Sequence, residues 1–176
     1  TERLTLTLDG EVAAGLATVQ VTFDGILNDQ LHGFYRSTYT ADDGAEHTIA
    51  TTQFQSTDAR RCFPCWDEPE YKATFETTLI VDADHLAVTN TSEVAETTLD
   101  DGRRRIQYAP TMVMSTYLVA FVVGPLEATE PIHAGGVPIR VIHRPGQGDR
   151  TSFALDVAAA ALDWFADYYA IPYPSD

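Results

Sequence analysis

Residues 51–75, TTQFQSTDARRCFPCWDEPEYKATF, are the stretch from which the fold is worked out. Gln53 and Gln55 stand near its start, and alternate positions of a β-strand point to the same face. Further on, Pro64 and Pro69 limit helix on either side, because proline removes a backbone donor. The pattern predicts a strand that presents two glutamines at its end and leads into a short turn.

Charged side chains dominate the predicted turn. We expect Thr57 or Asp58 to cap a short helical segment, since both residue types accept hydrogen bonds from the first N–H groups of a helix. An exposed cluster of acids and arginines contributes little stability, so its expected role is to orient the turn that presents Gln53. This cluster is predicted to be structural rather than catalytic, and it comprises Asp58, Arg60, Arg61, Asp67 and Glu68.

Hydrophobic residues alternate with polar ones through much of the first two-thirds of the chain, as is typical of half-buried strands. Asp42-Asp43-Gly44 separates two such runs and predicts a β-hairpin. The continuously apolar run at 117–123 suits a strand that is buried on both faces. The expected strands are residues 4–8, 17–23, 35–39, 47–51, 73–81, 117–123 and 137–143.

The spacing of hydrophobic residues changes near the end of the chain. From Asp149 onward it predicts an α-helix, with Asp149, Thr151 or Ser152 as the N-cap, which stops before Ile-Pro-Tyr-Pro at 171–174. A β-rich domain ending near Gly148, followed by the first helix of another unit, explains this change. The residues at helical spacing are Leu155, Ala158, Leu162, Phe165 and Tyr169.

The composition is that of a folded, strongly acidic protein. With 176 residues, 44% of them hydrophobic, the chain can bury the core of one domain and carry a piece of another. The formal net charge of −15 repels a nucleic-acid backbone, so a nucleic-acid partner is not expected. A negative surface suits a cationic ligand, such as a peptide with a free α-amine.

Neither a membrane span nor a secreted scaffold is expected. The longest apolar run, at 117–123, is far shorter than the roughly 20 residues that cross a bilayer. Cys62 and Cys65 are too few for a disulfide framework, which favours a reduced, cytoplasmic protein. The chain begins with Thr1 rather than Met, so an upstream targeting segment could precede it.

Four ordered segments resemble one enzyme family. In the zinc aminopeptidase N family, gluzincin metallopeptidases related to leukotriene A4 hydrolase, Thr-Gln-x-Glu precedes an Arg-containing turn, Phe-Pro-Cys-x-Asp-Glu-Pro and Lys-Ala-x-Phe, and residues 51–75 are similar to that signature. Residues 33–39 look like its Gly-x-Tyr-x-Ser-x-Tyr hairpin, and residues 114–121 look like its Met-Ser-Thr-Tyr-Leu-x-Ala-Phe strand. The helix ending at 171–174 falls in the expected order.

The resemblance implies a fold and a domain organisation. The fold is mainly β: a saddle-like antiparallel β-sandwich followed by one C-terminal helix. Residues 1–148 would form the N-terminal β domain without its first strands, and residues 149–176 would open a catalytic domain that lies beyond the chain.

It also implies a function for the full-length protein, which would remove N-terminal residues from peptides with the help of zinc. In this chain Gln53 would line the pocket for the N-terminal side chain, and Gln55, where relatives usually have Glu, would help to hold the α-ammonium. No catalytic residue and no metal ligand is assigned here, because no two histidines have the i, i+4 spacing of a zincin helix. The isolated chain is therefore expected to be inactive.

Two alternatives remain at this point. The same β architecture also occurs in relatives without peptidase function, so the chain could be a non-catalytic peptide- or protein-interaction domain. Cys62-x-x-Cys65 could also be a redox pair or half of a zinc ribbon. The redox motif lacks its βαβ context and the ribbon lacks a second pair, which favours two buried structural thiols.

Overall fold

The computed structural model describes residues 3–174, and two antiparallel sheets form its main body. The larger sheet has four strands in the order β1-β2-β7-β4, and β1 and β2 form a hairpin with an unbroken register from Gly33↔Gln53 to Thr40↔Glu46. The smaller sheet has three strands in the order β3-β6-β5. The bounds are β1 (Gly33–Thr40), β2 (Glu46–Gln53), β3 (Thr78–Val81), β4 (Leu86–Thr89), β5 (Glu93–Thr98), β6 (Arg104–Tyr108) and β7 (Phe121–Gly124).

The two sheets bury a shared core. Ile106 and Tyr108 of β6 are almost fully buried, and they pack with Ala87 of β4 and Val123 of β7. The Tyr108 hydroxyl also donates a hydrogen bond of 2.9 Å to the Ala87 carbonyl, which links the central strand of the smaller sheet to the edge strand β4 of the larger one. The main body is therefore a β-sandwich, as the sequence predicts.

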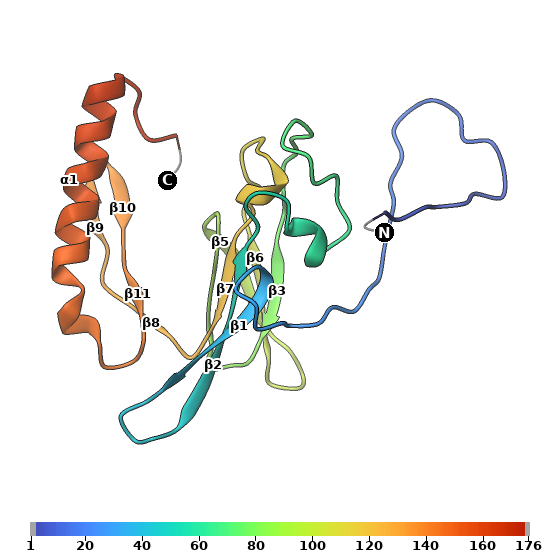
Figure 1. Ribbon diagram of the computed structural model, residues 1–176. Helices are drawn as coiled ribbons and strands as arrows, with labels where there is room; N and C mark the ends of the chain where they lie inside the picture. Colours follow the sequence, from blue (N-terminus) through green and yellow to red (C-terminus); the bar gives the residue numbers. More distant parts are fainter. Residues whose placement is uncertain (1–2, 175–176) are drawn as a thin grey trace.

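A smaller part follows β7 in the chain. Two short antiparallel pairs, β8 with β11 and β9 with β10, lead to the helix α1, which contacts β9 and β10. Figure 1 shows this part on the side of the molecule opposite the N-terminal segment. Its elements are β8 (Glu127–Ala128), β9 (Ile132–Ala134), β10 (Val137–Ile139), β11 (Ile142–His143), the short turn η3 (Gly148–Arg150) and α1 (Ser152–Tyr169).

Several sequence predictions are confirmed. The hairpin turns at Gly44, whose φ of +86° lies in the left-handed region that favours glycine. Thr151 is the N-cap of α1, although its hydroxyl bonds to the Gly148 carbonyl rather than to a helix N–H. The helix ends where Ala170 adopts a left-handed conformation, ahead of Pro172.

The strands expected at 4–8 and 17–23 are wrong. Residues 3–27 contain no strand in the structure, and Figure 1 shows them as a long excursion away from the sheets. Their alternating hydrophobic side chains are exposed, including Leu4, Val19 and Phe23. A strand needs a neighbour to satisfy its backbone groups, and none of the described strands lies beside this segment.

Three other expected strands are shorter than predicted. The run at 117–123 is divided between the turn η2 (Thr116–Leu118) and β7, because Asn90 bonds both the Leu118 carbonyl and the Ala120 N–H. The run at 73–81 is a strand only from Thr78. The run at 137–143 changes partner, since β10 pairs with β9 and β11 pairs with β8.

The stability of the sandwich depends on Ile106. Replacing Ile106 with Ala should lower the free energy of unfolding by about 2–5 kcal/mol, because the side chain is 2% exposed and its removal leaves a cavity. As a control, Val94 of β5 is 64% exposed, and Val94→Ala should change the free energy of unfolding by at most about 0.5 kcal/mol. Urea denaturation of both variants measures this difference, and equal effects would show that the sheets do not share this core.

Candidate functional site

Gln53 and Gln55 lie on either side of a buried phenylalanine. Gln53 is the last residue of β2, opposite Gly33 of β1, and its side chain is exposed. Phe54 is 2% exposed, and Gln55 is exposed again. The alternation therefore continues one step past the strand, and both amides face solvent.

The backbone after Gln55 forms a short 3-10 turn, η1 (Ala59–Arg61), which is fixed by hydrogen bonds. The Asp58 N–H donates to the Phe54 carbonyl at 2.9 Å, and the Cys62 N–H donates to the Ala59 carbonyl at 2.8 Å. Ala59 has no exposed surface and packs against Phe54. The chain after Gln55 is thus anchored to the core within four residues.

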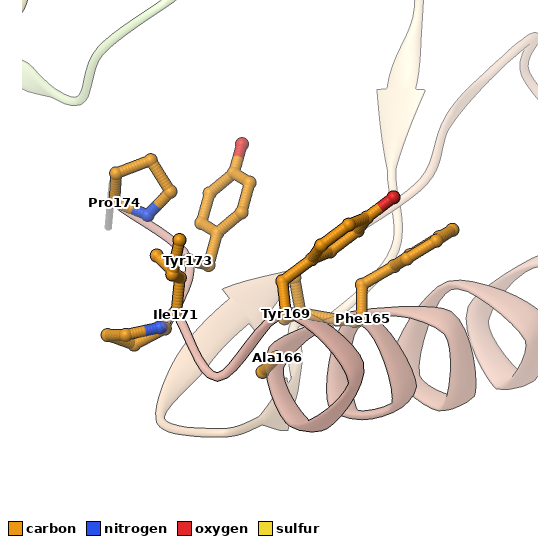
Figure 2. A pocket seen from close by; sticks show the side chains of 8 residues that line it. Phe165, Ala166, Tyr169, Ile171, Tyr173 and Pro174 are labelled. Atoms are coloured by element: carbon orange, nitrogen blue, oxygen red, sulfur yellow. The ribbon is translucent and has the colours of Figure 1, made fainter.

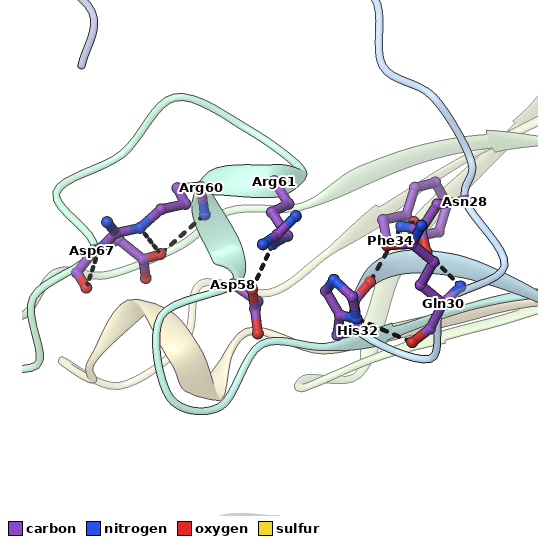
Figure 3. A network of polar contacts seen from close by, with 8 residues as sticks. All are labelled: Asn28, Gln30, His32, Phe34, Asp58, Arg60, Arg61 and Asp67. Atoms are coloured by element: carbon purple, nitrogen blue, oxygen red, sulfur yellow. Dashed lines mark hydrogen bonds and ion pairs between the residues drawn. The ribbon is translucent and has the colours of Figure 1, made fainter. Parts of the chain in front are cut away.

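Arg60 and Asp67 form a largely buried ion pair that closes the loop after η1. The Asp67 carboxylate is 3% exposed, and its Oδ2 accepts hydrogen bonds from the Arg60 backbone N–H at 3.0 Å and from the Arg60 Nε at 2.9 Å. Arg60 also donates to the Asp67 carbonyl. Figure 3 shows this double attachment beside η1.

A second ion pair lies within the turn, which comes close to the start of β1. Arg61 Nε donates to Asp58 Oδ1 at 2.6 Å, so Asp58 occupies the N-cap position without capping the turn through its side chain. A Cβ at Gly33 would lie 3.0 Å from the Arg61 Cβ, and the φ of +69° at Gly33 also favours glycine. The close approach of η1 to the start of β1 therefore requires glycine at 33.

Asn28 supports the same end of β1. Its side-chain Nδ2 donates to the Phe34 and His32 carbonyls, and its own carbonyl accepts from the Arg36 N–H at 2.7 Å. Figure 3 shows Asn28 and His32 on the β1 side of the turn. Within residues 3–174, Glu68 makes no ion pair, so it does not join this network as the sequence predicted.

Cys62 and Cys65 are free thiols that pack against the Phe54 core. Burial raises the pKa of the Cys62 thiol to about 11. Burial, reinforced by the Asp67 carboxylate, raises the pKa of the Cys65 thiol to about 11 as well. Reactive cysteines have lowered pKa values, so these two suit the structural interpretation.

Neither Gln53 nor Gln55 lines either of two hollows formed by residues among 3–174. One, of about 380 Å³, lies beside Cys65 and is walled by Phe63, Trp66 and Tyr71. The other, of about 220 Å³, lies where the end of α1 faces the segment 171–174. Figure 2 shows the aromatic rings of Phe165, Tyr169 and Tyr173 around it.

Metal ligands are not gathered anywhere in the part of the chain that the structure describes. No three His, Cys, Asp or Glu side chains among residues 3–174 form a group that could hold a metal ion. The described residues therefore do not supply the ligand set that a zinc enzyme needs. What the site does offer is two neutral amides on an anchored strand end, each able to donate and accept hydrogen bonds.

Comparison with known proteins identifies the family. Residues 1–118 match the model of the peptidase M1 N-terminal domain. The chain belongs to the peptidase M1 family.

Its relatives include an aminopeptidase M1 of Arabidopsis thaliana, 44% identical over 91% of this chain and 18% of the relative. The puromycin-sensitive aminopeptidase of Caenorhabditis elegans is 41% identical over 97% of this chain and 18% of its own length. Human endoplasmic reticulum aminopeptidase 1 is 37% identical over 98% of this chain and 18% of its own length. This M1 chain thus spans about a fifth of the length of these relatives.

Three features of this structure were not predicted from the sequence. Phe54 anchors the candidate site, Asn28 braces β1, and Trp66 walls the larger hollow. The burial of Phe54 could have been inferred from its place between two polar residues on a strand. The contacts of Asn28 and Trp66 depend on loops whose course no periodicity describes.

Removing the charge of Asp67 should destabilise this M1 domain. Asp67→Asn leaves a half-buried guanidinium without its carboxylate, and we expect a loss of about 2–4 kcal/mol in the free energy of unfolding. The matched control is Asp101→Asn, whose carboxylate pairs with Arg103 at the surface, where solvent screens the ion pair, so this change should have little effect on stability. Thermal or urea denaturation measures the stability of both variants. Similar losses of stability would show that the Arg60–Asp67 pair contributes no more than an ion pair at the surface.

The thiols should react slowly in the folded state. Two pH units separate a pKa of about 11 from the ordinary 9.0, so the folded thiolate population at neutral pH should be about 100-fold smaller than that of the unfolded chain. Iodoacetamide labelling in buffer and in urea measures the ratio. Because the folded pKa values are raised, keeping the thiols protonated contributes to the free energy of unfolding. This contribution is complete below pH 9 and is lost as pH rises toward 11. Rapid labelling of the native chain would revive the redox interpretation.

Proposed function

We propose that this chain is the N-terminal substrate-cleft domain of a zinc-dependent metallo-aminopeptidase. The single observation that carries the proposal is the presentation of Gln53 and Gln55 to solvent from a strand end that Phe54 and η1 hold in place. The M1 family membership and the names of the relatives, all aminopeptidases, support it.

In this proposal the two glutamines contact the N-terminal residue of a peptide. The Gln55 side-chain oxygen accepts a hydrogen bond from the substrate α-ammonium, and Gln53 lines the pocket for the first side chain. A hydrogen bond to a charged donor contributes more than a neutral one, although an amide acceptor holds a cation less strongly than a carboxylate does. The net charge of −15 adds a general attraction for cationic peptide ends.

Zinc would bind in the catalytic domain of the longer protein, and residues 149–176 would be the first segment of that domain. Bound zinc would activate water for attack on the peptide bond. The residues described here supply no ligands for it, so they would bind and orient the substrate only. The isolated chain is proposed to be inactive.

A cytoplasmic location is also proposed, because both cysteines are free thiols. None of the helices among residues 3–174 is both long and apolar enough to cross a membrane.

The role of Gln55 can be tested in the full-length protein with aminoacyl p-nitroanilide substrates. Gln55→Glu should lower KM about 3–10-fold, because a carboxylate replaces a neutral acceptor for the ammonium. Gln55→Ala should raise KM by a similar factor, because the acceptor is lost. In both variants kcat should change less than KM.

Gln107 provides a matched control. It is an exposed glutamine between buried Ile106 and Tyr108 on β6, far along the chain from Gln55, and Gln107→Ala should leave KM unchanged. Equal KM values for Gln55→Glu, Gln55→Ala and the unmodified protein would refute the amine-binding role. A full-length protein without any aminopeptidase activity would instead support a non-catalytic interaction domain.

A further inference from the structure

The loop after η1 forms the larger hollow, of about 380 Å³, and the inner wall of this hollow rests on the core. Phe63, Cys65 and Phe75 line it and are themselves packed against the buried cluster around Phe54. A hollow of this size lies in the range in which proteins hold small organic molecules. Its inner wall is therefore a fixed apolar surface rather than a gap between loose side chains.

Buried hydroxyl groups hold the loop that carries the remaining walls. The Thr116 hydroxyl donates to the Trp66 carbonyl at 2.9 Å, and the Ser115 hydroxyl donates to the Pro69 carbonyl at 2.6 Å. Because Ser115 and Thr116 are both buried, water does not compete for these hydrogen bonds. The hollow is therefore formed before any ligand binds.

Trp66 and Tyr71 form an outer wall that the described chain leaves uncovered. Trp66 is 74% exposed and Tyr71 is 53% exposed. The indole N–H and the phenol O–H have no hydrogen-bond partner among residues 3–174. Buried tryptophan and tyrosine side chains usually satisfy these groups, so a ligand that covers the two rings must offer acceptors for them.

Lys72 gives the hollow its charge. It is the only lysine in the sequence, it is exposed, and it makes no ion pair with any residue among 3–174. Glu68 and Glu70 of the same loop do not line the hollow. The Cys65 thiol does line it, but burial raises its pKa to about 11, so it is neutral at pH 7. Among the described residues that line the hollow, Lys72 therefore carries the one charge.

These side chains select a ligand with an anionic group on an apolar body. The Lys72 ammonium and the Trp66 indole only donate hydrogen bonds, and the Tyr71 hydroxyl can donate one as well. A carboxylate offers two acceptor oxygens and a charge opposite to that of Lys72. A cationic ligand would meet a like charge, and a neutral ligand would lack the charge-assisted hydrogen bond.

The strong negative charge of the chain limits the ligand but does not exclude it. The net charge of −15 repels anions at long range, yet salt screens this repulsion over about 8 Å at physiological ionic strength. Hydrogen bonds and an opposite charge at contact distance inside a hollow are screened less. Because each further negative charge on the ligand adds to the repulsion, a single carboxylate is favoured over a dicarboxylate.

We propose that this hollow binds a small monocarboxylate with an apolar or aromatic body. Lys72 holds the carboxylate, and the body lies against the aromatic side chains of the walls. Neither Gln53 nor Gln55 lines the hollow, so the proposal does not rest on the proposed function, and its failure would leave that function standing.

Tryptophan fluorescence of the 176-residue chain tests the charge requirement directly. The chain has two tryptophans, so Trp164→Phe leaves Trp66 as the reporter of the hollow. The probes are phenylbutyrate and two compounds with the same body, the neutral phenylbutanamide and the cationic phenylbutylamine. Phenylbutyrate should change the Trp66 emission in a saturable way, and the amide and the amine should each bind at least about tenfold more weakly.

Matched charge variants locate the effect. Lys72→Gln removes the charge from an exposed side chain, so it should weaken binding of phenylbutyrate about tenfold and leave the affinity for the amide within about twofold. Arg105→Gln removes the same charge from an exposed position on β6 that does not line the hollow, and it should leave both affinities within about twofold. Circular dichroism verifies that each variant keeps its fold.

Three results with the chain would overturn the proposal: no change in emission with phenylbutyrate, equal binding of the acid and the amide, or an unchanged affinity in Lys72→Gln. A fourth comes from an N-acetylated tripeptide that ends in phenylalanine, which carries the same two groups at its C-terminus. If it bound more tightly than phenylbutyrate, the hollow would be assigned to peptide ends instead of a free acid.

Calorimetric titration of the full-length protein with phenylbutyrate completes the test. An affinity within about threefold of that of the 176-residue chain would support the proposal, because the hollow would then be open in the whole protein. Binding to the chain without binding to the full-length protein would show that the rest of the polypeptide covers the hollow, and it would overturn the proposal.

Discussion

The burial of Phe54 is the interaction on which the rest of the candidate site depends. Its ring packs edge-on against Phe63 at 6.0 Å and Phe121 at 6.3 Å between centroids, so it ties the end of β2 to the loop after η1 and to β7. Because Phe54 points into the core, its two neighbours along the chain point outward. The location of Gln53 and Gln55 is thus set by a hydrophobic contact rather than by any polar interaction of their own.

Local patterns predicted those parts of the fold whose causes are local. Asp42-Asp43-Gly44 specifies its hairpin because glycine tolerates the left-handed conformation, and α1 follows from spacing and its terminal signals. The alternation in 4–8 and 17–23 is just as regular, yet it produces no strand. Alternation shows which face of a strand would be buried but not which strand would pair with it.

In the candidate site, the sequence predicts the position of the two glutamines but not the pairing of the charged residues. Alternation places the two glutamines on one face, whereas the pairing of Arg60 with Asp67, and of Arg61 with Asp58, depends on how the loop folds back. Adjacent arginines and several nearby acids permit more than one pairing. Burial decides among them, because only Asp67 lies deep enough for its ion pair to be shielded from water.

The order of the strands has a consequence for how this chain is made. The hairpin of β1 and β2 can form as soon as it leaves the ribosome, but the residues that cover Phe54, including Met114, Val119 and Phe121, come about 60 residues later. At typical translation rates of about 5–20 residues per second, Phe54 lacks these later contacts for roughly 3–12 seconds and is covered only by nearby residues such as Ala59 and Phe63. During that time part of the ring is exposed, and exposed hydrophobic surface favours aggregation, so the nascent chain passes through an interval of greater risk before β7 is made.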